Sequence, residues 1–279
     1  MVDNKKTFNI SLTVDVEDYT FGVDRHRFIE ALTPLLESMR NDAVKATFFV
    51  NGEVINDWRG QIIELASEGH EIGLHGFTHR YLENIGKREF REELKRGFSM
   101  LASILESSPA GFRAPYFSLN TRTPWAPDLI LESGFIYSSS VLPCRNVQSG
   151  FPGAPRHPFL WENGLVEFPA PVYGIGDWRL PMFGGGYLRV MPKALVNLSA
   201  HRARRYRGSW TYCHPYDFDV DEPKRSRQEQ SWLLSKLLAA NRELMLPRIV
   251  ELVDKDSELL ENLARDHEFV GELQRFAMR

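Results

Sequence analysis

The chain has 279 residues, a net charge of −3, 43% hydrophobic and 25% charged residues. This composition is ordinary for a soluble globular enzyme and supplies a core for one large domain. The slightly negative net charge argues against a protein that binds polyanions over its whole surface, so we expect no nucleic-acid partner. The two cysteines, Cys144 and Cys213, lie outside any CxxC pair, which excludes a disulfide framework.

The N-terminal stretch MVDNKKTFNISLTVDVEDY has no basic start followed by a long apolar run, so we expect no signal peptide. The longest apolar runs fall short of the roughly 18 residues that a membrane helix needs, so we expect no transmembrane span. Both observations favour a cytoplasmic location.

Strand-like and helix-like segments alternate along the first half of the chain. Apolar β-branched runs predict the strands, and apolar residues at helical spacing predict the helices. A glycine at position 69 ends the second predicted helix. In chain order we predict strand 8–16, helix 27–42, strand 45–52, helix 61–70, strand 70–76, helix 88–108, strand 110–117, helix 127–134 and strand 135–141.

This βαβα order predicts a parallel sheet with helices outside it. The length and the number of units favour an irregular (β/α) barrel of about seven parallel strands over a doubly wound sheet. No GxGxxG follows the first strand and no GxxxxGK[ST] occurs, so a nucleotide-binding α/β fold has no support.

The second half is organised differently. Residues 143–192 are rich in Pro, Gly and aromatic residues, and we expect long loops with short strands that shape a cleft. A helix over 192–208 and a final strand over 209–219 follow. We divide the chain into a catalytic domain, 1–224, and a C-terminal helical extension packed on the barrel, 225–279. The apolar residues of this extension fit packing on the barrel or a homodimer contact, and both stay open.

Polar residues stand at the C-terminal ends of four predicted strands, where barrel enzymes keep their functional groups. They are Asp15, Glu17 and Asp18, then His75 and His79, then Arg113, Pro115 and Tyr116, and finally His214.

Each of these groups also has an ordinary structural explanation. An HxxxH pair alone is usually two satisfied loop histidines, three acids form a solvated turn or a helix cap, and an arginine pairs with a surface acid. Together they are more specific, because two histidines and one carboxylate make a three-ligand zinc set with a fourth position for water. Near such a centre, an arginine orients an acid and a histidine serves as general acid.

The segments TVDVEDY, KATFFVNG, EGHEIGLHGFTH, GFRAPYF and YCHPYDF occur in this order over about residues 10–217. In these motifs the chain resembles the polysaccharide deacetylases, the NodB-homology group of carbohydrate esterases. The DVEDY form and the GGGY loop resemble the branch found with exopolysaccharide and O-antigen assembly genes.

The resemblance implies a metal-dependent hydrolase that removes an N-acetyl group from an amino sugar of a surface polysaccharide or its precursor. It implies that His75, His79 and one acid bind a divalent metal, usually Zn²⁺. It also implies that Asp15 is the general base and is held by Arg113, and that His214 protonates the departing amine. A backbone N–H near Tyr116 would help to stabilise the oxyanion.

One departure concerns the acidic ligand. Most members carry adjacent aspartates, but Val16 follows Asp15 here. Strand alternation places Asp15 and Glu17 on one face, which favours Glu17 as the ligand. If the strand ends at Val16, Asp18 can take that place.

The substrate-binding residues are less defined. We expect Tyr116, the Asp177–Trp178 loop and Tyr187 to contact the sugar, and residues 184–186 to let the backbone approach it; packing of Trp178 in the core stays open. The basic run is either a solvated helix face or a contact for the phosphate of a nucleotide- or lipid-linked sugar. It consists of Arg202, Arg204, Arg205 and Arg207.

Three other functions remain as alternatives. One is a deformylase or allantoinase-like amide hydrolase on the same fold. Another is an inactive carbohydrate-binding relative, which is disfavoured because every expected catalytic residue type is present. The third is a non-haem iron oxygenase, which would have no use for the additional acid and the Arg-Pro pair.

Overall fold

A computed structural model describes residues 7–18, 27–146, 149–175, 178–220 and 240–278. Its centre is one nine-stranded sheet in the order β10-β1-β2-β3-β4-β5-β7-β6-β11, and the first seven strands are mutually parallel. These seven are β10 (Trp210–Cys213), β1 (Ser11–Val16), β2 (Ala46–Val50), β3 (Glu71–Leu74), β4 (Gly111–Phe112), β5 (Tyr137–Ser138) and β7 (Val166–Glu167).

The far edge of the sheet is mixed. β6 (Phe159–Trp161) runs antiparallel to β7, and β11 (Arg275–Phe276) runs parallel to β6. A separate antiparallel hairpin joins β8 (Tyr173–Ile175) to β9 (Trp178–Leu180). The mostly parallel α/β fold is confirmed, with seven parallel strands. No pairing joins β10 to β11 among the described residues, so closure into a barrel stays a prediction.

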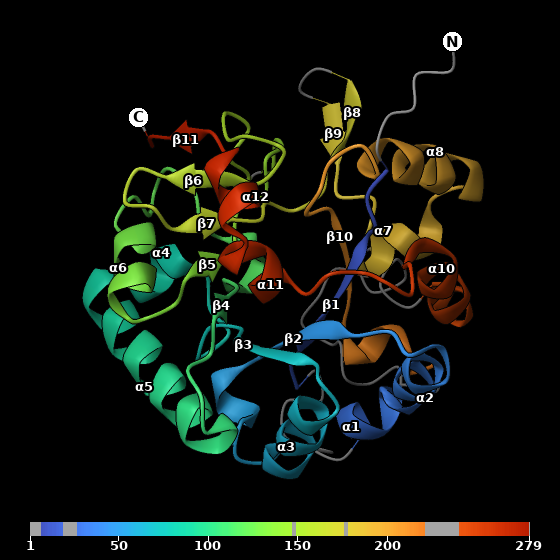
Figure 1. Cartoon of the computed structure of the whole chain (residues 1–279), viewed down its shortest axis with the longest axis horizontal. Coiled ribbons are helices and arrows are strands. Elements are labelled where there is room, and N and C mark those ends of the chain that lie inside the picture. Colours follow the sequence, from blue (N-terminus) through green and yellow to red (C-terminus); the bar gives the residue numbers. More distant parts are fainter. Residues whose placement is uncertain (1–6, 19–26, 147–148, 176–177, 221–239, 279) are drawn as a thin grey trace.

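Helices surround the curved sheet on the outside (Figure 1). The α-helices are α1 (Arg27–Ala31), α2 (Thr33–Asp42), α3 (Arg59–Ser67), α4 (Leu82–Ile85), α5 (Lys87–Leu105), α6 (Ala126–Glu132), α7 (Gly185–Val190), α8 (Lys193–Ala203), α10 (Met245–Leu252), α11 (Leu260–Arg265) and α12 (His267–Gly271). Short 3₁₀ turns are η1 (Gly52–Val54), η2 (Pro115–Phe117), η3 (Pro215–Asp217) and η5 (Arg242–Leu244).

Local sequence explains where several elements end. The helix predicted over 27–42 is divided into α1 and α2, and Pro34 lies in the first turn of α2, where its missing N–H costs nothing. Gly69 has φ +86° just after α3, as its role in ending that helix requires. The long helix α5 is amphipathic and buries Phe90, Leu94 and Leu101 against the sheet.

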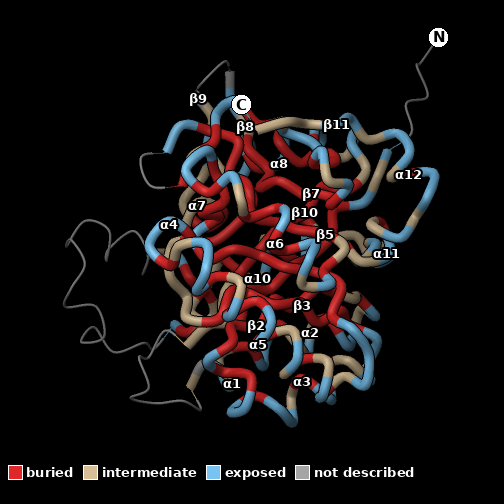
Figure 2. Tube along the Cα trace, turned by 90° about the vertical axis from the view of Figure 1, so that its left-hand side faces the viewer, coloured by how far each residue is buried: buried red, intermediate tan, exposed pale blue. Residues whose placement is uncertain are grey.

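The core lies between the sheet and these helices. Figure 2 shows the strands largely buried, with exposed segments in the surrounding helices and loops. Every residue of β1, β2 and β3 is buried. Strands buried on both faces are typical of parallel sheets, and they hold the residues that follow them in fixed positions.

The C-terminal segment is tied to the sheet at two places. β11 adds a strand at the sheet edge, which departs from the expectation of a purely helical extension. The backbone N–H of Glu261 in α11 donates to Glu71 at the start of β3, at 3.0 Å. α11 overlies the strands in the view of Figure 1. The domain boundary after residue 224 and the homodimer contact stay predictions, and Leu233, Leu234, Leu237 and Leu238 lie outside the described residues.

Among the described residues, no helix combines the length and the hydropathy that a membrane span requires. The cytoplasmic location stays a prediction.

Candidate active site

Asp15 and Arg113 form a buried ion pair at the C-terminal ends of β1 and β4. Arg113 Nη1 lies 2.6 Å from Asp15 Oδ1, and their side chains are 0% and 3% exposed. The same guanidinium donates to Thr13 Oγ1 at 2.9 Å and to Ser139 Oγ at 2.9 Å. The ring of Phe49 packs against its face, 4.1 Å away. Thr13 and Ser139 thus fix the plane of the guanidinium, and its rigid geometry holds Asp15 Oδ1 in place.

His75 and His79 flank a tight turn that follows β3. His75 N–H continues the strand pairing to Val50 O at 2.9 Å. Gly76 has φ +60°, and a Cβ there would lie 2.7 Å from Pro115. The turn therefore needs glycine between the two histidines. It brings the two imidazole centroids within 5.2 Å of each other.

The orientation of His75 is set by its second ring nitrogen. Nδ1 lies 3.2 Å from the carbonyl oxygen of Arg113. A carbonyl only accepts, so Nδ1 carries the proton and Nε2 offers its lone pair. A backbone carbonyl behind a histidine is the usual support for a metal-binding imidazole.

Glu17, His75 and His79 each present one ligand atom, and these atoms lie within 4.8 Å of one another. A tetrahedral zinc site with bonds near 2.1 Å has ligand atoms about 3.4 Å apart, so small side-chain movements would close the set. The donors fit a divalent cation, because two imidazoles and one carboxylate leave a fourth position open. Asp18 is half-buried and is not a member of this group among the described residues.

The electrostatics of this group follow from its burial. Burial opposes ionisation of Glu17, but the charge and hydrogen bond of His79, with help from His214 and His75, lower the pKa of Glu17 to about 2. Burial disfavours the charged form of His79, but the charge and hydrogen bond of Glu17 outweigh the effect of burial and raise the pKa of His79. Burial lowers the pKa of His75 to about 4, so its imidazole is neutral near neutral pH, as a metal ligand must be.

His214 follows β10 and is supported by two buried charged residues. Its Nδ1 lies 3.0 Å from Asp217 Oδ2, and its backbone N–H donates to the same oxygen at 2.9 Å. Arg189 Nη2 lies 3.1 Å from Asp217 Oδ1, and both side chains are 0% exposed. Burial lowers the pKa of His214, but the hydrogen bond and charge of Asp217 prevail and raise it.

Tyr116 stands beside the histidines. Its backbone has φ 59°, a left-handed conformation that non-glycine residues adopt rarely. Its ring stacks on Tyr81 with centroids 4.3 Å apart, and it lies 4.8 Å from the ring of His79. The side chain is 45% exposed, so it forms an accessible aromatic wall next to the Glu17 group.

The other two substrate-binding predictions have different outcomes. Trp178 begins β9, and its side chain lies outside what the structure describes, as does Asp177. Tyr187 is half-buried in α7. A Cβ on Gly184 would lie 1.9 Å from the ring of Tyr212, so this glycine makes room for a tyrosine of β10. Gly185 instead faces His214, whose Cε1 would lie 3.4 Å from an added Cβ.

Sequence reasoning gave no role to the residues that support the predicted ones. Thr13 and Ser139 hold Arg113, and Asp217 and Arg189 stand behind His214. The serine run 138–140 directly after β5 and the acid three residues after His214 were available signals. Arg189 gave none, because it lies in a loop-rich segment without a strand-end pattern.

Comparison with known families divides the chain in two. Residues 3–128 match the family described as "Polysaccharide deacetylase". Residues 139–263 match a family described as "Domain of unknown function (DUF3473)", and this match crosses the boundary expected after residue 224. The first match contains Asp15, Glu17, His75, His79 and Arg113; the second contains His214.

Curated relatives resemble about a third of the chain. A peptidoglycan-N-acetylglucosamine deacetylase of Bacillus cereus is 29% identical over 101 residues, which are 36% of this chain and 37% of that protein. A chitin deacetylase of Pestalotiopsis sp is 35% identical over 89 residues, which are 31% of this chain and 30% of that protein. The chain therefore spans about a third of the length of these relatives.

A solved structure supports the fold. The crystal structure of a proposed polysaccharide deacetylase from Mycobacterium smegmatis aligns with a TM-score of 0.54 at 21% identity. The alignment covers 90% of this chain and 93% of that one, so the likeness extends over both halves.

Proposed function

We propose that this chain, whose residues 3–128 match the family described as "Polysaccharide deacetylase", is a hydrolase that removes the N-acetyl group from an amino sugar of a surface polysaccharide or its precursor. One observation carries this proposal: Glu17, His75 and His79 gather beside the buried Asp15–Arg113 pair. The named activities of the relatives, deacetylation of peptidoglycan and of chitin, support an amino-sugar substrate.

Glu17, His75 and His79 would hold the metal, and we expect Zn²⁺ from the donor set of two imidazoles and one carboxylate. When bound, such a cation would polarise the acyl carbonyl and lower the pKa of a water molecule. The carbonyl of Arg113 keeps His75 in the required tautomer.

Asp15 takes a proton from the attacking water. Its Oδ1 is held by Arg113 Nη1, so Oδ2 is the oxygen that accepts the proton. Arg113 keeps the carboxylate aimed, because its rigid guanidinium donates to Oδ1 and is itself held by Thr13 and Ser139. The exposed ring of Tyr116 would contact the sugar, and a backbone N–H near Tyr116 would help to stabilise the oxyanion.

His214 gives a proton to the departing amine. Asp217 occupies its Nδ1, so Nε2 faces the leaving group. The raised pKa keeps a fraction of His214 protonated near neutral pH, as a general acid requires. Arg189 fixes Asp217 from behind. Water adds to the acyl carbon, the amide C–N bond breaks, and acetate and a free amine leave.

The test is acetate release from free, nucleotide-linked and polymeric N-acetyl sugars, with and without a chelator. We expect acetate from at least one class of sugar, loss of release after chelation, and recovery on adding Zn²⁺. Turnover that survives complete chelation would exclude this mechanism. Release of formate in place of acetate would reassign the acyl group.

A further inference from the structure

The basic run at the end of α8 divides into two pairs with different surroundings. Arg204 pairs with Asp254 at 3.1 Å and donates to Leu252 O at 3.0 Å. Arg207 pairs with Glu258 and, at 2.7 Å, with Asp266. The charges of Arg204 and Arg207 are thus neutralised within the chain.

Arg202 and Arg205 line a separate pocket of about 220 Å³, where Arg156 joins them from the segment before β6. None of the described residues that line this pocket carries a carboxylate. In the part of the chain that the structure describes, no ion pair is found for any of these three arginines. The three arginines therefore share one pocket without a counter-charge from the described residues. Their positive charges repel one another unless an anion is bound.

Aromatic and proline side chains complete the wall. The rings of His157 and Tyr206 stack 3.5 Å apart at 16°, and Tyr206 is 45% exposed. Desolvation by its neighbours and the positive charge of Arg156 lower the pKa of His157 to about 4. His157 is then neutral near neutral pH, and the charge of the pocket comes from the arginines.

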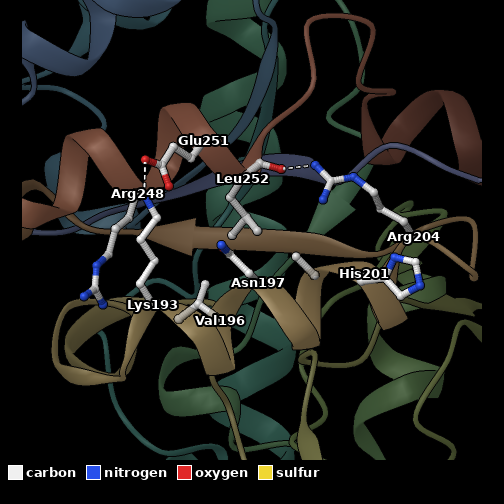
Figure 3. A pocket seen from close by; sticks show the side chains of 9 residues that line it. Lys193, Val196, Asn197, His201, Arg204, Arg248, Glu251 and Leu252 are labelled. Carbon is white, nitrogen blue, oxygen red and sulfur yellow. Dashed lines mark hydrogen bonds and ion pairs between the residues drawn. The ribbon is translucent and has the colours of Figure 1, made fainter.

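A second, larger pocket of about 440 Å³ between α8 and α10 provides a contrast (Figure 3). Its cations are engaged within the chain. Lys193 pairs with Glu251 at 2.6 Å, Arg204 donates to the Leu252 carbonyl, and Arg248 donates to Met191 O at 2.8 Å. The smaller pocket differs from the larger one because its arginines have no acidic partner among the described residues.

We propose that the pocket lined by Arg156, Arg202, Arg205 and Tyr206 binds an anionic saccharide, a sugar unit that carries a carboxylate or a phosphate. A guanidinium group can donate two parallel hydrogen bonds to a carboxylate or to a phosphate, which makes arginine a bidentate ligand for both anions. Tyrosine offers an apolar face with a polar tip, which suits a sugar ring. The volume is below the roughly 300–1,000 Å³ of sites for drug-sized ligands, so it suits a single sugar unit.

This pocket lies apart from the proposed catalytic centre. It includes Ser209, just before β10, whereas His214 follows that strand. The four strand residues between Ser209 and His214 separate them by about 17 Å. One sugar unit cannot reach both, so the pocket would hold another unit of the same glycan or a separate molecule. The choice of a saccharide rests on the proposed function; the choice of an anion rests on the arginines alone.

Calorimetric titration of the full chain tests the proposal with four probes: an oligoglucuronate, glucose 1-phosphate, neutral cellotetraose, which lacks N-acetyl groups, and inorganic phosphate. We expect saturable binding of at least one anionic sugar that weakens with added salt, and weaker binding of cellotetraose and of inorganic phosphate. Equal affinity for the neutral sugar or for inorganic phosphate would overturn the proposal, as would the absence of binding by both anionic sugars.

Variants test whether the anionic sugar binds in this pocket. Arg202→Ala with Arg205→Ala should weaken it by roughly tenfold or more, since a hydrogen bond to a charged group contributes at that level. Arg59→Ala with Arg88→Ala, which removes two exposed arginines elsewhere, should leave it unchanged. Tyr206→Phe should bind normally and Tyr206→Ala weakly. Equal losses in both double variants would contradict the assignment, and so would tighter binding to phosphatidylglycerol vesicles than to either sugar.

The binding assay needs no turnover, so its outcome is independent of the deacetylase proposal. His75→Ala should bind the anionic sugar like the wild type even when it releases no acetate.

Discussion

Asp15 contributes one oxygen to Arg113 and keeps the other for a proton. Asp15→Asn preserves the shape and an oxygen for Arg113 but removes the base. Acetate release should fall by roughly 10²–10⁴-fold, the usual contribution of a general base. Metal content should stay at the wild-type level, because Asp15 is not among the three grouped ligands. A normal rate, or loss of metal in this variant, would reassign Asp15.

Glu17 and Asp18 form a matched pair at the end of β1. Glu17→Gln should bind metal weakly, because it removes the only carboxylate of the group, while Asp18→Asn should bind it normally. Elemental analysis after dialysis against a limiting chelator measures both. The opposite order would make Asp18 the ligand and the observed pairing of Glu17 with His79 incidental.

At this scale the sequence predicts residue types better than their partners. Strand-end positions made the acids, histidines and Arg113 candidates; the structure pairs Asp15 with Arg113 and groups Glu17 with the two histidines. The choice between Glu17 and Asp18 stayed open because β1 ends at Val16, so alternation no longer fixes which acid turns inward. Arg189 could not be found, because its link to Asp217 exists only in three dimensions.

At the scale of elements, the base of β3 carries a buried acid that joins the strand to α11. Glu71 accepts hydrogen bonds from Tyr137, from Thr47 at 2.7 Å and from the Glu261 backbone at 3.0 Å. Burial raises the pKa of Glu71 from 4.5 to about 7, although these three donors oppose the shift.

The pH dependence of stability follows from that shift. The pKa of Glu71 is higher in the folded chain than in the unfolded chain, so the protonated acid supports the fold fully below about pH 4.5. This support is lost as the pH rises through about 7. The loss amounts to roughly 3 kcal/mol.

Urea unfolding of the wild type and of Glu71→Gln, from about pH 5 to about pH 9, measures the stability that is lost when Glu71 ionises. The uncharged variant should lose less of its free energy of unfolding than the wild type over this range. Parallel curves for the two proteins would show that Glu71 does not titrate in this window.

The longer elements could be predicted because burial on one side or both leaves a clear pattern. These longer elements are α5 and the strands β1, β2 and β3. β7 and β11 have two residues each, too few for any periodicity, so only pairing with neighbours defines them. The division of the first helical segment into α1 and α2 follows Pro34, which the apolar spacing alone did not reveal.

For the whole molecule, parallel pairing is what brings distant segments to one place. β1, β3, β4 and β10 all end at the same edge of the sheet, so residues from Asp15 to His214 meet there. The order of strands could be expected from the βαβα pattern. The ties of the C-terminal segment to Glu71 and to β6 could not, because they join residues more than 100 positions apart.

The most direct test of the account is a crystal structure of the full chain grown with zinc, with anomalous data at the zinc edge. We predict one peak bonded to Glu17, to His75 Nε2 and to His79 at about 2.0–2.2 Å, with Asp15 beside it and still paired with Arg113. Imidazoles turned away from Glu17, with no anomalous density between them, would contradict the account.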